Sequence, residues 1–261
     1  MRDRGIAGST LKLIAMICML IDHIGAVIVW GVIEASYAES ATAASAAVTM
    51  ADLFNCNPGM VILYYIMRSV GRIAFPIFCF LLVEGFVHTR SRKKYALRLL
   101  LFALVSEIPF DLANKAKLIE FSYQNVFFTL FIGLLAICVL EEVSLRFGET
   151  VDKRTLYGTN IAVTAAAMLA AYYLKTDYSL FGVLAIVIMY LFKEQKKKGM
   201  LYGCVVLIIQ SFLELFALVD IALVGMYNGK RGLKFKYLFY IFYPAHLIAL
   251  YYIAVRMGII T

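Results

Sequence analysis

The chain has 261 residues, of which 63% are hydrophobic and 16% are charged, and its mean hydropathy is +0.84. A soluble domain has about 45–50% apolar and about 25% charged residues, so this much apolar surface cannot be hidden in one soluble core. The composition excludes a secreted domain, a cytosolic enzyme and a DNA-binding regulator. The formal net charge of +8 therefore indicates topology and contact with membrane lipids, and no nucleic-acid partner is expected.

Apolar segments follow one another along almost the whole chain. At about 20 residues for each span plus loops, the chain has room for about eight or nine transmembrane helices and for no separate soluble domain. We therefore predict an all-α, polytopic integral membrane helical bundle that forms one domain over residues 1–261. The apolar segments are 11–33, 60–87, 95–112, 123–140, 156–174, 178–192, 200–227 and 237–258.

Basic residues gather before the first segment and in four of the connections. The other connections hold few cations. The positive-inside rule then places the N-terminus and the basic connections in the cytoplasm, and the protein in the cell membrane as a multi-pass protein. The cations concerned are Arg2, Arg4 and Lys12 and those of connections 88–98, 141–156, 193–198 and 228–236.

Two segments are irregular. Segment 200–227 lies between two basic connections, so a single crossing would put one of them outside. A tight hairpin that turns near Ser211–Glu214 keeps both inside, although each arm is too short to cross alone. Segment 60–87 would be about 42 Å long as a straight helix, more than the hydrocarbon core, so we expect either tilt or a kink at Gly71 or Pro76.

The cysteines and histidines predict no metal site. The five cysteines form no pair with metal-ligand spacing, and the three histidines are scattered. Small apolar cysteines packed inside the bundle are the simpler interpretation.

Ionisable side chains within the apolar segments are the most informative residues, because each costs roughly 2.5–3.5 kcal/mol at the centre of a membrane. His23 lies near the middle of the first segment. Lys12 is eleven residues earlier, so both share one face of a helix about 16 Å apart. That face would hold a cation at the cytoplasmic end and a base near the membrane centre. A structural histidine bonded to a neighbouring helix is the alternative.

The other buried charges need partners. Asp22 points about 100° away from His23, so it either orients His23 indirectly or forms a salt bridge with a neighbouring helix. Arg72 and Glu107 lie at similar depths, which favours a buried ion pair, and a catalytic role is the alternative. Glu84 lies near the cytoplasmic end, where Arg98 of the next helix would meet it.

Two further groups of polar residues stand at segment ends. Glu107 and Asp111 share a face unless Pro109 breaks the helix, and two such carboxylates need a cation or a shared proton. Gln124 and Asn125 open the next segment, where they either cap the helix or bind a substrate.

The cations of connection 88–98 have two interpretations. The first is topological, through the positive-inside rule. The second is a docking site for phosphates beside an interior cavity. The cluster consists of Arg90, Arg92, Lys93, Lys94 and Arg98.

Several strings of this sequence resemble the TraX family, and together they cover nearly the whole chain. The family acetylates the N-terminus of conjugative pilin, so the resemblance implies acetyl-coenzyme A as the donor. It does not name the acceptor, for which a pilin-like N-terminus and a surface glycan both stay open. The strings are Leu11–Gly25, Gly71–Gly85, Ser106–Asp111, Gln124–Thr129 and Phe242–His246.

The chain is also similar, more loosely, to the membrane acyltransferase-3 and heparan-glucosaminide acetyltransferase families. Their first helix carries a basic residue ahead of an essential histidine, as Lys12 and His23 do here. The likeness makes His23 the candidate base or acyl relay. Lys12 departs from the usual arginine of acyltransferase-3 proteins and is a weaker bidentate phosphate ligand.

The leading hypothesis is an acetyl-coenzyme A-dependent membrane acyltransferase for an amine or hydroxyl acceptor. The alternatives are a small transporter or proton-coupled exporter, and a non-catalytic assembly factor for a surface structure. The expected catalytic residues are His23, Asp22, Glu84, Arg72 and Glu107, and the expected coenzyme-binding residues are Lys12, Arg90, Lys93, Lys94 and Arg98.

Overall fold

The computed structural model describes residues 5–40, 48–233 and 236–260, and this part of the chain is almost entirely helical. Isolated bridges are its only β-structure. The all-α prediction is therefore confirmed for the described residues, whereas Arg2 and Arg4 lie outside them.

The first half of the chain contains α1 (Gly8–His23), the π-helical stretch η1 (Ile24–Val29), α2 (Trp30–Ser40), α3 (Met50–Cys56), α4 (Pro58–Gly71), α5 (Ala74–His88), α6 (Arg92–Lys115) and α7 (Val126–Phe147). Of these, α1, η1 and α2 form one continuous span, and α4 and α5 form another with a break between them. The second half contains α8 (Lys153–Tyr173), α9 (Ser179–Leu191), α10 (Lys196–Gln210), the 3₁₀ stretch η2 (Phe212–Leu218), α11 (Val219–Gly225) and α12 (Lys236–Arg256).

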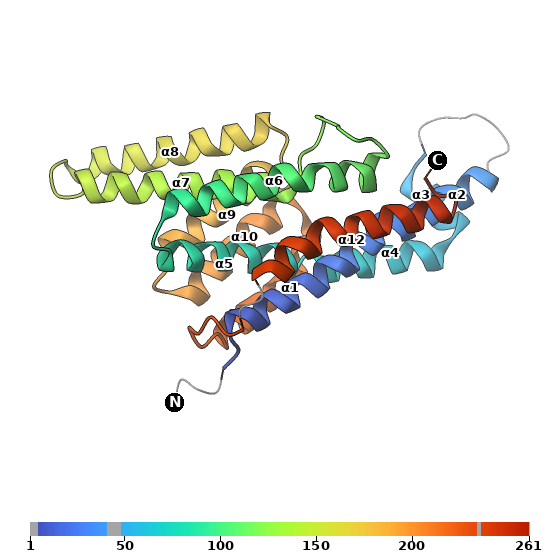
Figure 1. Cartoon of the computed structure of the whole chain (residues 1–261), viewed down its shortest axis with the longest axis horizontal. Helices are drawn as coiled ribbons and strands as arrows, with labels where there is room; N and C mark the ends of the chain where they lie inside the picture. The colour runs from blue at the N-terminus through green and yellow to red at the C-terminus, as the bar shows by residue number, and fades with distance from the viewer. Residues whose placement is uncertain (1–4, 41–47, 234–235, 261) are drawn as a thin grey trace.

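The helices lie roughly along the long axis of the molecule (Figure 1). Helices α1, α4 and α12 form one side, α5, α9 and α10 the middle, and α6, α7 and α8 the opposite side (Figure 1). The start of α1 lies at the same end as the turns after α5, α7, α9 and α11, where the basic connections lie (Figure 1).

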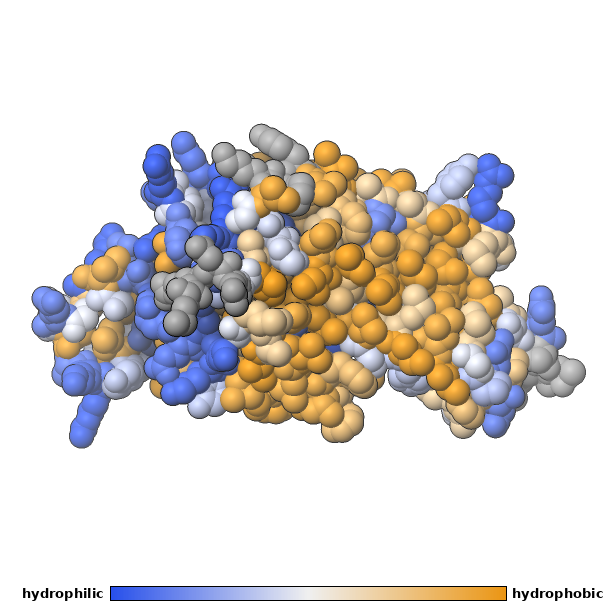
Figure 2. Space-filling model, turned by 90° about the horizontal axis from the view of Figure 1, so that it is seen from below, coloured by the Kyte–Doolittle hydropathy of each residue, from blue (hydrophilic) through white to orange (hydrophobic). Residues whose placement is uncertain are grey.

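The surface has the pattern of a membrane protein. Figure 2 shows a broad hydrophobic zone with hydrophilic residues gathered at the two ends of the molecule. Large apolar side chains such as Ile66, Val105, Ile161 and Ile241 are exposed at the surface of the molecule. Among the described residues, four helices are long and apolar enough to cross a membrane: Gly8–Glu39, Pro58–His88, Val126–Phe147 and Leu238–Arg256.

The expected hairpin is present. Helix α10 ends at Gln210, and η2 and α11 return beside it, so both flanking basic connections lie at the N-terminal end (Figure 1). The returning arm begins as a 3₁₀ helix and buries Glu214. The two arms pack against each other and against neighbouring helices on one side, which supports arms too short to cross a membrane alone.

The break in segment 60–87 falls at Arg72 and Ile73, one residue after the expected Gly71. Pro76 makes no kink, because it lies in the first turn of α5, where a missing N–H costs little. Gly71 has a different role. A Cβ atom there would collide with the carboxylate of Asp22, so glycine lets α4 approach α1 closely.

The start of the chain is held by the connection that follows α11. The backbone N–H of Ile6 donates to Met226 at 2.9 Å, and that of Gly8 donates to Lys230 at 2.9 Å. The next residue, Ser9, donates in the same way to the carbonyl of Arg231. This pairing brings the basic connection that follows α11 beside the first turns of α1.

Candidate active site

Two cavities lie along the inner face of α1. The first, which we call the histidine cavity, has a volume of about 260 Å³ and is lined by His23. The second, the basic cavity, has a volume of about 700 Å³ and lies at the N-terminal end of the molecule, beside Lys12. Both volumes are close to those of small-molecule sites.

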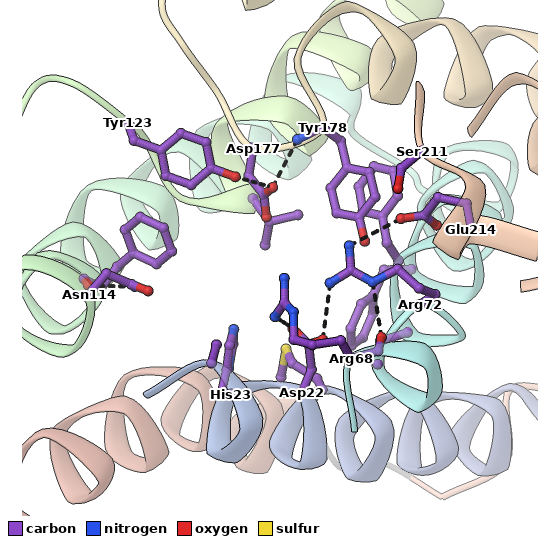
Figure 3. Close-up of a pocket in the computed structure, with 18 of the residues that line it drawn as sticks. Asp22, His23, Arg68, Arg72, Asn114, Tyr123, Asp177, Tyr178, Ser211 and Glu214 are labelled. Carbon is purple, nitrogen blue, oxygen red and sulfur yellow. Dashed lines mark hydrogen bonds and ion pairs between the residues drawn. The ribbon is translucent and has the colours of Figure 1, made fainter. Parts of the chain in front are cut away.

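His23 is the last residue of α1, and the helix widens into π-helical η1 directly after it. Such π-helical turns occur often at functional sites, because they change the direction of a side chain within a continuous helix. Figure 3 shows His23 and Asp22 rising from this helix, opposite Tyr123, Asp177 and Tyr178.

His23 contacts a second histidine from the far end of the chain. Its Nδ1 atom lies 2.7 Å from Nε2 of His246 on α12. The two ring planes are inclined by only 16° and the centroids lie 4.9 Å apart, so the rings meet edge to edge through these nitrogens. The Nδ1 atom of His246 lies 2.8 Å from the carbonyl oxygen of Phe242. The expected alternative for His23, a bond to a neighbouring helix, is therefore present together with its place in a cavity.

A network of charges forms one wall of the histidine cavity (Figure 3). Asp22 accepts hydrogen bonds from Arg68 at 2.5 Å and from Arg72 at 3.0 Å. Arg72 also donates to Glu214 of η2 at 3.2 Å. Two guanidinium groups and two carboxylates balance in charge, which makes their burial tolerable. Of the two roles expected for Asp22, the salt bridge is the one present, and Asp22 makes no hydrogen bond to His23.

The expected pair between Arg72 and Glu107 does not form, because Arg72 is bound to Asp22 and Glu214 while Glu107 is bound to Asn125. Glu107 accepts hydrogen bonds from the backbone N–H of Asn125, at 3.2 Å, and from the Asn125 side chain. The side-chain oxygen of Asn125 accepts from the N–H of Phe127 at 3.0 Å and caps α7. Capping is thus confirmed, and Glu107 braces the cap outside both cavities.

The opposite wall of the histidine cavity is a short connection between α8 and α9. Its residue Asp177 accepts hydrogen bonds from the Tyr123 hydroxyl at 2.5 Å and from the N–H of Tyr178 at 2.9 Å. Desolvation raises the pKa of the Asp177 carboxyl, while the hydrogen bond from Tyr123 opposes the shift. Tyr178 adopts a φ of 59° and stacks on Phe75 at 3.7 Å, which closes this side of the cavity.

The basic cavity brings cations together from three parts of the chain. Lys12 comes from α1, Arg90 and Arg98 flank the start of α6, and Arg231 follows α11. None of these four side chains has a carboxylate within ion-pair distance in the part of the chain that the structure describes. Unpaired cations around one cavity are suited to a polyanionic ligand.

The contacts of Glu84, Lys93 and Lys94 at this end differ from those expected from the sequence. Glu84 pairs with Lys196 of α10 at 2.8 Å and not with Arg98, because α10 packs closely against α5. Glu84 therefore lines the basic cavity and does not approach His23. Lys93 and Lys94 are exposed on α6 and line neither cavity.

Aromatic rings separate the two cavities. The Nζ atom of Lys12 lies 3.9 Å from the centre of the Phe239 ring. Phe239 packs near Phe127, Phe127 packs against Tyr243 at 4.6 Å, and Tyr243 meets the His23 ring at 6.0 Å. We call this set the aromatic wall; it consists of Phe78, Phe102, Phe127, Phe239 and Tyr243.

The chain is similar to known proteins over most of its length. The family described as TraX protein matches residues 7–254, which includes both cavities. The chain belongs to the TraX family. A protein of Dichelobacter nodosus, named "probable fimbrial assembly protein FimC, serogroup H1", is 30% identical over 213 residues. The match covers 72% of this chain and 82% of that protein, whereas no solved structure matches.

Some residues of the two cavities were missed by the sequence analysis of this TraX-family chain. Arg68 lies four residues before Arg72 in the same apolar segment, so its charge was a usable signal. Asp177 and Arg231 gave no such signal, because both lie in connections where charged residues are ordinary. Only the packing of the helices brings them to the cavities.

Proposed function

We propose that this chain is an integral-membrane acyltransferase that moves an acetyl group from acetyl-coenzyme A to an amine or hydroxyl acceptor. One observation carries the proposal: a cavity lined by cations that pair with no carboxylate of the described residues adjoins, through an aromatic wall, a second cavity that contains His23. Membership of the TraX family supports it.

The residues of the basic cavity fit the phosphate groups of the coenzyme. Lys12, Arg90, Arg98 and Arg231 offer donors without competing carboxylates at the ion-pair distance, and Glu84 is already neutralised by Lys196. When bound, the coenzyme would supply the acetyl group as a thioester. The uncharged arm that carries the thioester is chemically compatible with the apolar rings between Lys12 and His23.

In the histidine cavity, His23 would take the proton that the acceptor loses as its nitrogen or oxygen attacks, or would relay the acyl group. Arg68 and Arg72 hold N–H donors at the same cavity and would stabilise negative charge that develops on the acyl oxygen. Asp22 serves this step by fixing both guanidinium groups.

The proposed orientation follows from charge. The basic connections and the start of α1 share one end of the molecule, which we assign to the cytoplasm (Figure 1). The apolar segments would then make the eight or nine crossings expected, and the basic cavity would lie on the side where acetyl-coenzyme A is made available.

A second function, a non-catalytic assembly factor for a surface fibre, is favoured by the name of the Dichelobacter relative. The two proposals are compatible if the acceptor is a fimbrial or pilin-like subunit. They differ in coenzyme binding, which an assembly factor does not need.

The test is binding of acetyl-coenzyme A to the detergent-purified protein, followed by release of free coenzyme A thiol in the presence of acceptor. Lys12→Met removes the charge and keeps the stem over Phe239, and should weaken binding by about 10-fold or more. Lys93→Met is the matched control, since it removes a cation from the same end outside the cavity. His23→Ala should keep binding and lose transfer.

The outcomes separate the hypotheses. Equal weakening by Lys12→Met and Lys93→Met would show general charge attraction and no built site. Folded protein that binds no coenzyme would overturn the enzyme and favour the assembly factor, and substrate flux across proteoliposomes without acylated product would indicate a transporter.

A further inference from the structure

The histidine pair has a defined order of hydrogen bonds. Nδ1 of His246 lies 2.8 Å from the carbonyl oxygen of Phe242, which can only accept, so Nδ1 must carry a proton. In a neutral imidazole the other nitrogen, Nε2, then has no proton and is an acceptor. The carbonyl of Phe242 therefore decides the tautomer of His246.

The tautomer of His246 in turn decides the tautomer of His23. Its Nδ1 lies 2.7 Å from the unprotonated Nε2 of His246, so His23 must donate there. In neutral His23 the proton is thus on Nδ1, and Nε2 holds a lone pair. Nε2 makes no hydrogen bond to any residue that the structure describes, and the ring lines the histidine cavity.

The rings are also held in orientation. His246 stacks on Phe242, with centroids 4.8 Å apart, meets His23 edge to edge through the hydrogen-bonded nitrogens, and has the edge of Tyr243 near it at 5.5 Å. Asp22 cannot orient His23, because its carboxylate is engaged with Arg68 and Arg72.

We propose that His246 is the positioning residue of the acyltransferase, which holds His23 in the tautomer whose Nε2 accepts the acceptor's proton. The effect of His246 on catalysis rests on the proposed function, whereas the order of hydrogen bonds from Phe242 through His246 to His23 belongs to the fold itself. An imidazole here takes the place that a carboxylate usually has behind a catalytic histidine. This hydrogen-bonded pair of histidines joins α1 to α12.

The tautomer can be measured directly by ¹⁵N NMR, because the chain has only three histidines. Histidine-labelled protein in detergent should give His23 and His246 signals with protonated Nδ1 and unprotonated Nε2. Assignment uses His23→Gln, His246→Gln and His88→Gln. The third histidine, His88, bonds the carbonyl of Glu84 on a separate helix and serves as an internal reference.

Two substitutions of His246 separate positioning from packing. His246→Phe keeps a flat ring between Phe242 and His23 but removes the acceptor, so His23 should lose its single tautomer. Transfer should then fall roughly 10- to 100-fold, with coenzyme binding unchanged. His246→Gln restores an acceptor oxygen for Nδ1 of His23 and should recover most of the rate.

Wild-type His23 with its proton on Nε2, or His246→Phe with unchanged transfer, would overturn the proposal. Equal loss in His246→Phe and His246→Gln would also overturn it, because it would show that the ring only packs. Wild-type protein that neither binds coenzyme nor transfers would overturn the proposed function, whereas the NMR signals report the pair whatever the activity.

Discussion

Asp22 on α1 holds Arg72 at the break between α4 and α5, with 3.0 Å between Oδ1 and Nη2. The other oxygen of the same carboxylate holds Arg68 at 2.5 Å. One side chain therefore binds both guanidinium groups beside His23, and Glu214 supplies the second negative charge. This balance makes Asp22 the central residue of the cavity wall.

Asp22→Asn should destabilise the fold strongly. It removes the ion-pair partner of Arg68 and leaves Arg72 with Glu214, and breaking a buried ion pair from one side costs about 3–5 kcal/mol. Unfolding in detergent by denaturant measures the loss. Glu142→Gln is the control, because its pair with Arg146 is exposed and worth about 0–1 kcal/mol. Equal effects of the two changes would contradict a buried network.

Gly71→Ala tests the close contact between α4 and α1. The new Cβ would collide with the Asp22 carboxylate, and forcing it in should cost about 1–3 kcal/mol. Thermal unfolding measures the change. Gly59→Ala, in the same helix, meets open space and should not destabilise. A Gly71→Ala protein as stable as wild type would show that the helices do not approach so closely.

Asn125→Ala should cost more than loss of an ordinary helix cap. It removes the cap of α7 and also the side-chain partner of Glu107, so we expect about 2–4 kcal/mol in denaturant unfolding. Asp152→Ala removes the exposed cap of α8 and should cost about 1 kcal/mol. Similar losses of stability in Asn125→Ala and Asp152→Ala would argue against a stabilising contact between Glu107 and the α7 cap.

The hairpin predicts a definite labelling pattern in whole cells. In a cysteine-free background, Lys197→Cys and Gly229→Cys lie at the two ends of the hairpin and should both resist an impermeant thiol reagent until the membrane is opened. Lys117→Cys, after α6, should react on intact cells. Opposite behaviour of Lys197→Cys and Gly229→Cys would mean that the segment crosses the membrane once.

The residues that were predicted well are those whose role is local. Asn125 precedes an apolar helix, and a cap needs only the next two or three residues. The hairpin after α10 follows from two basic connections and the length between them. Partners across helices were predicted poorly. Arg72 was expected to meet Glu107 but meets Asp22 and Glu214, and Glu84 meets Lys196 and not Arg98.

The sequence by itself determined the helical class, the apolar segments, the end of the molecule that carries the cations, and the common face of Lys12 and His23, because these depend on composition and on spacing within one helix. The tertiary structure alone decided which helices are neighbours. Packing turned His23 towards His246, enclosed Arg68 and Asp177 in one cavity, and added Arg231 to the basic cavity. Helical periodicity gives the direction of a side chain around its own axis, but the identity of the helix opposite depends on the packing of the whole bundle.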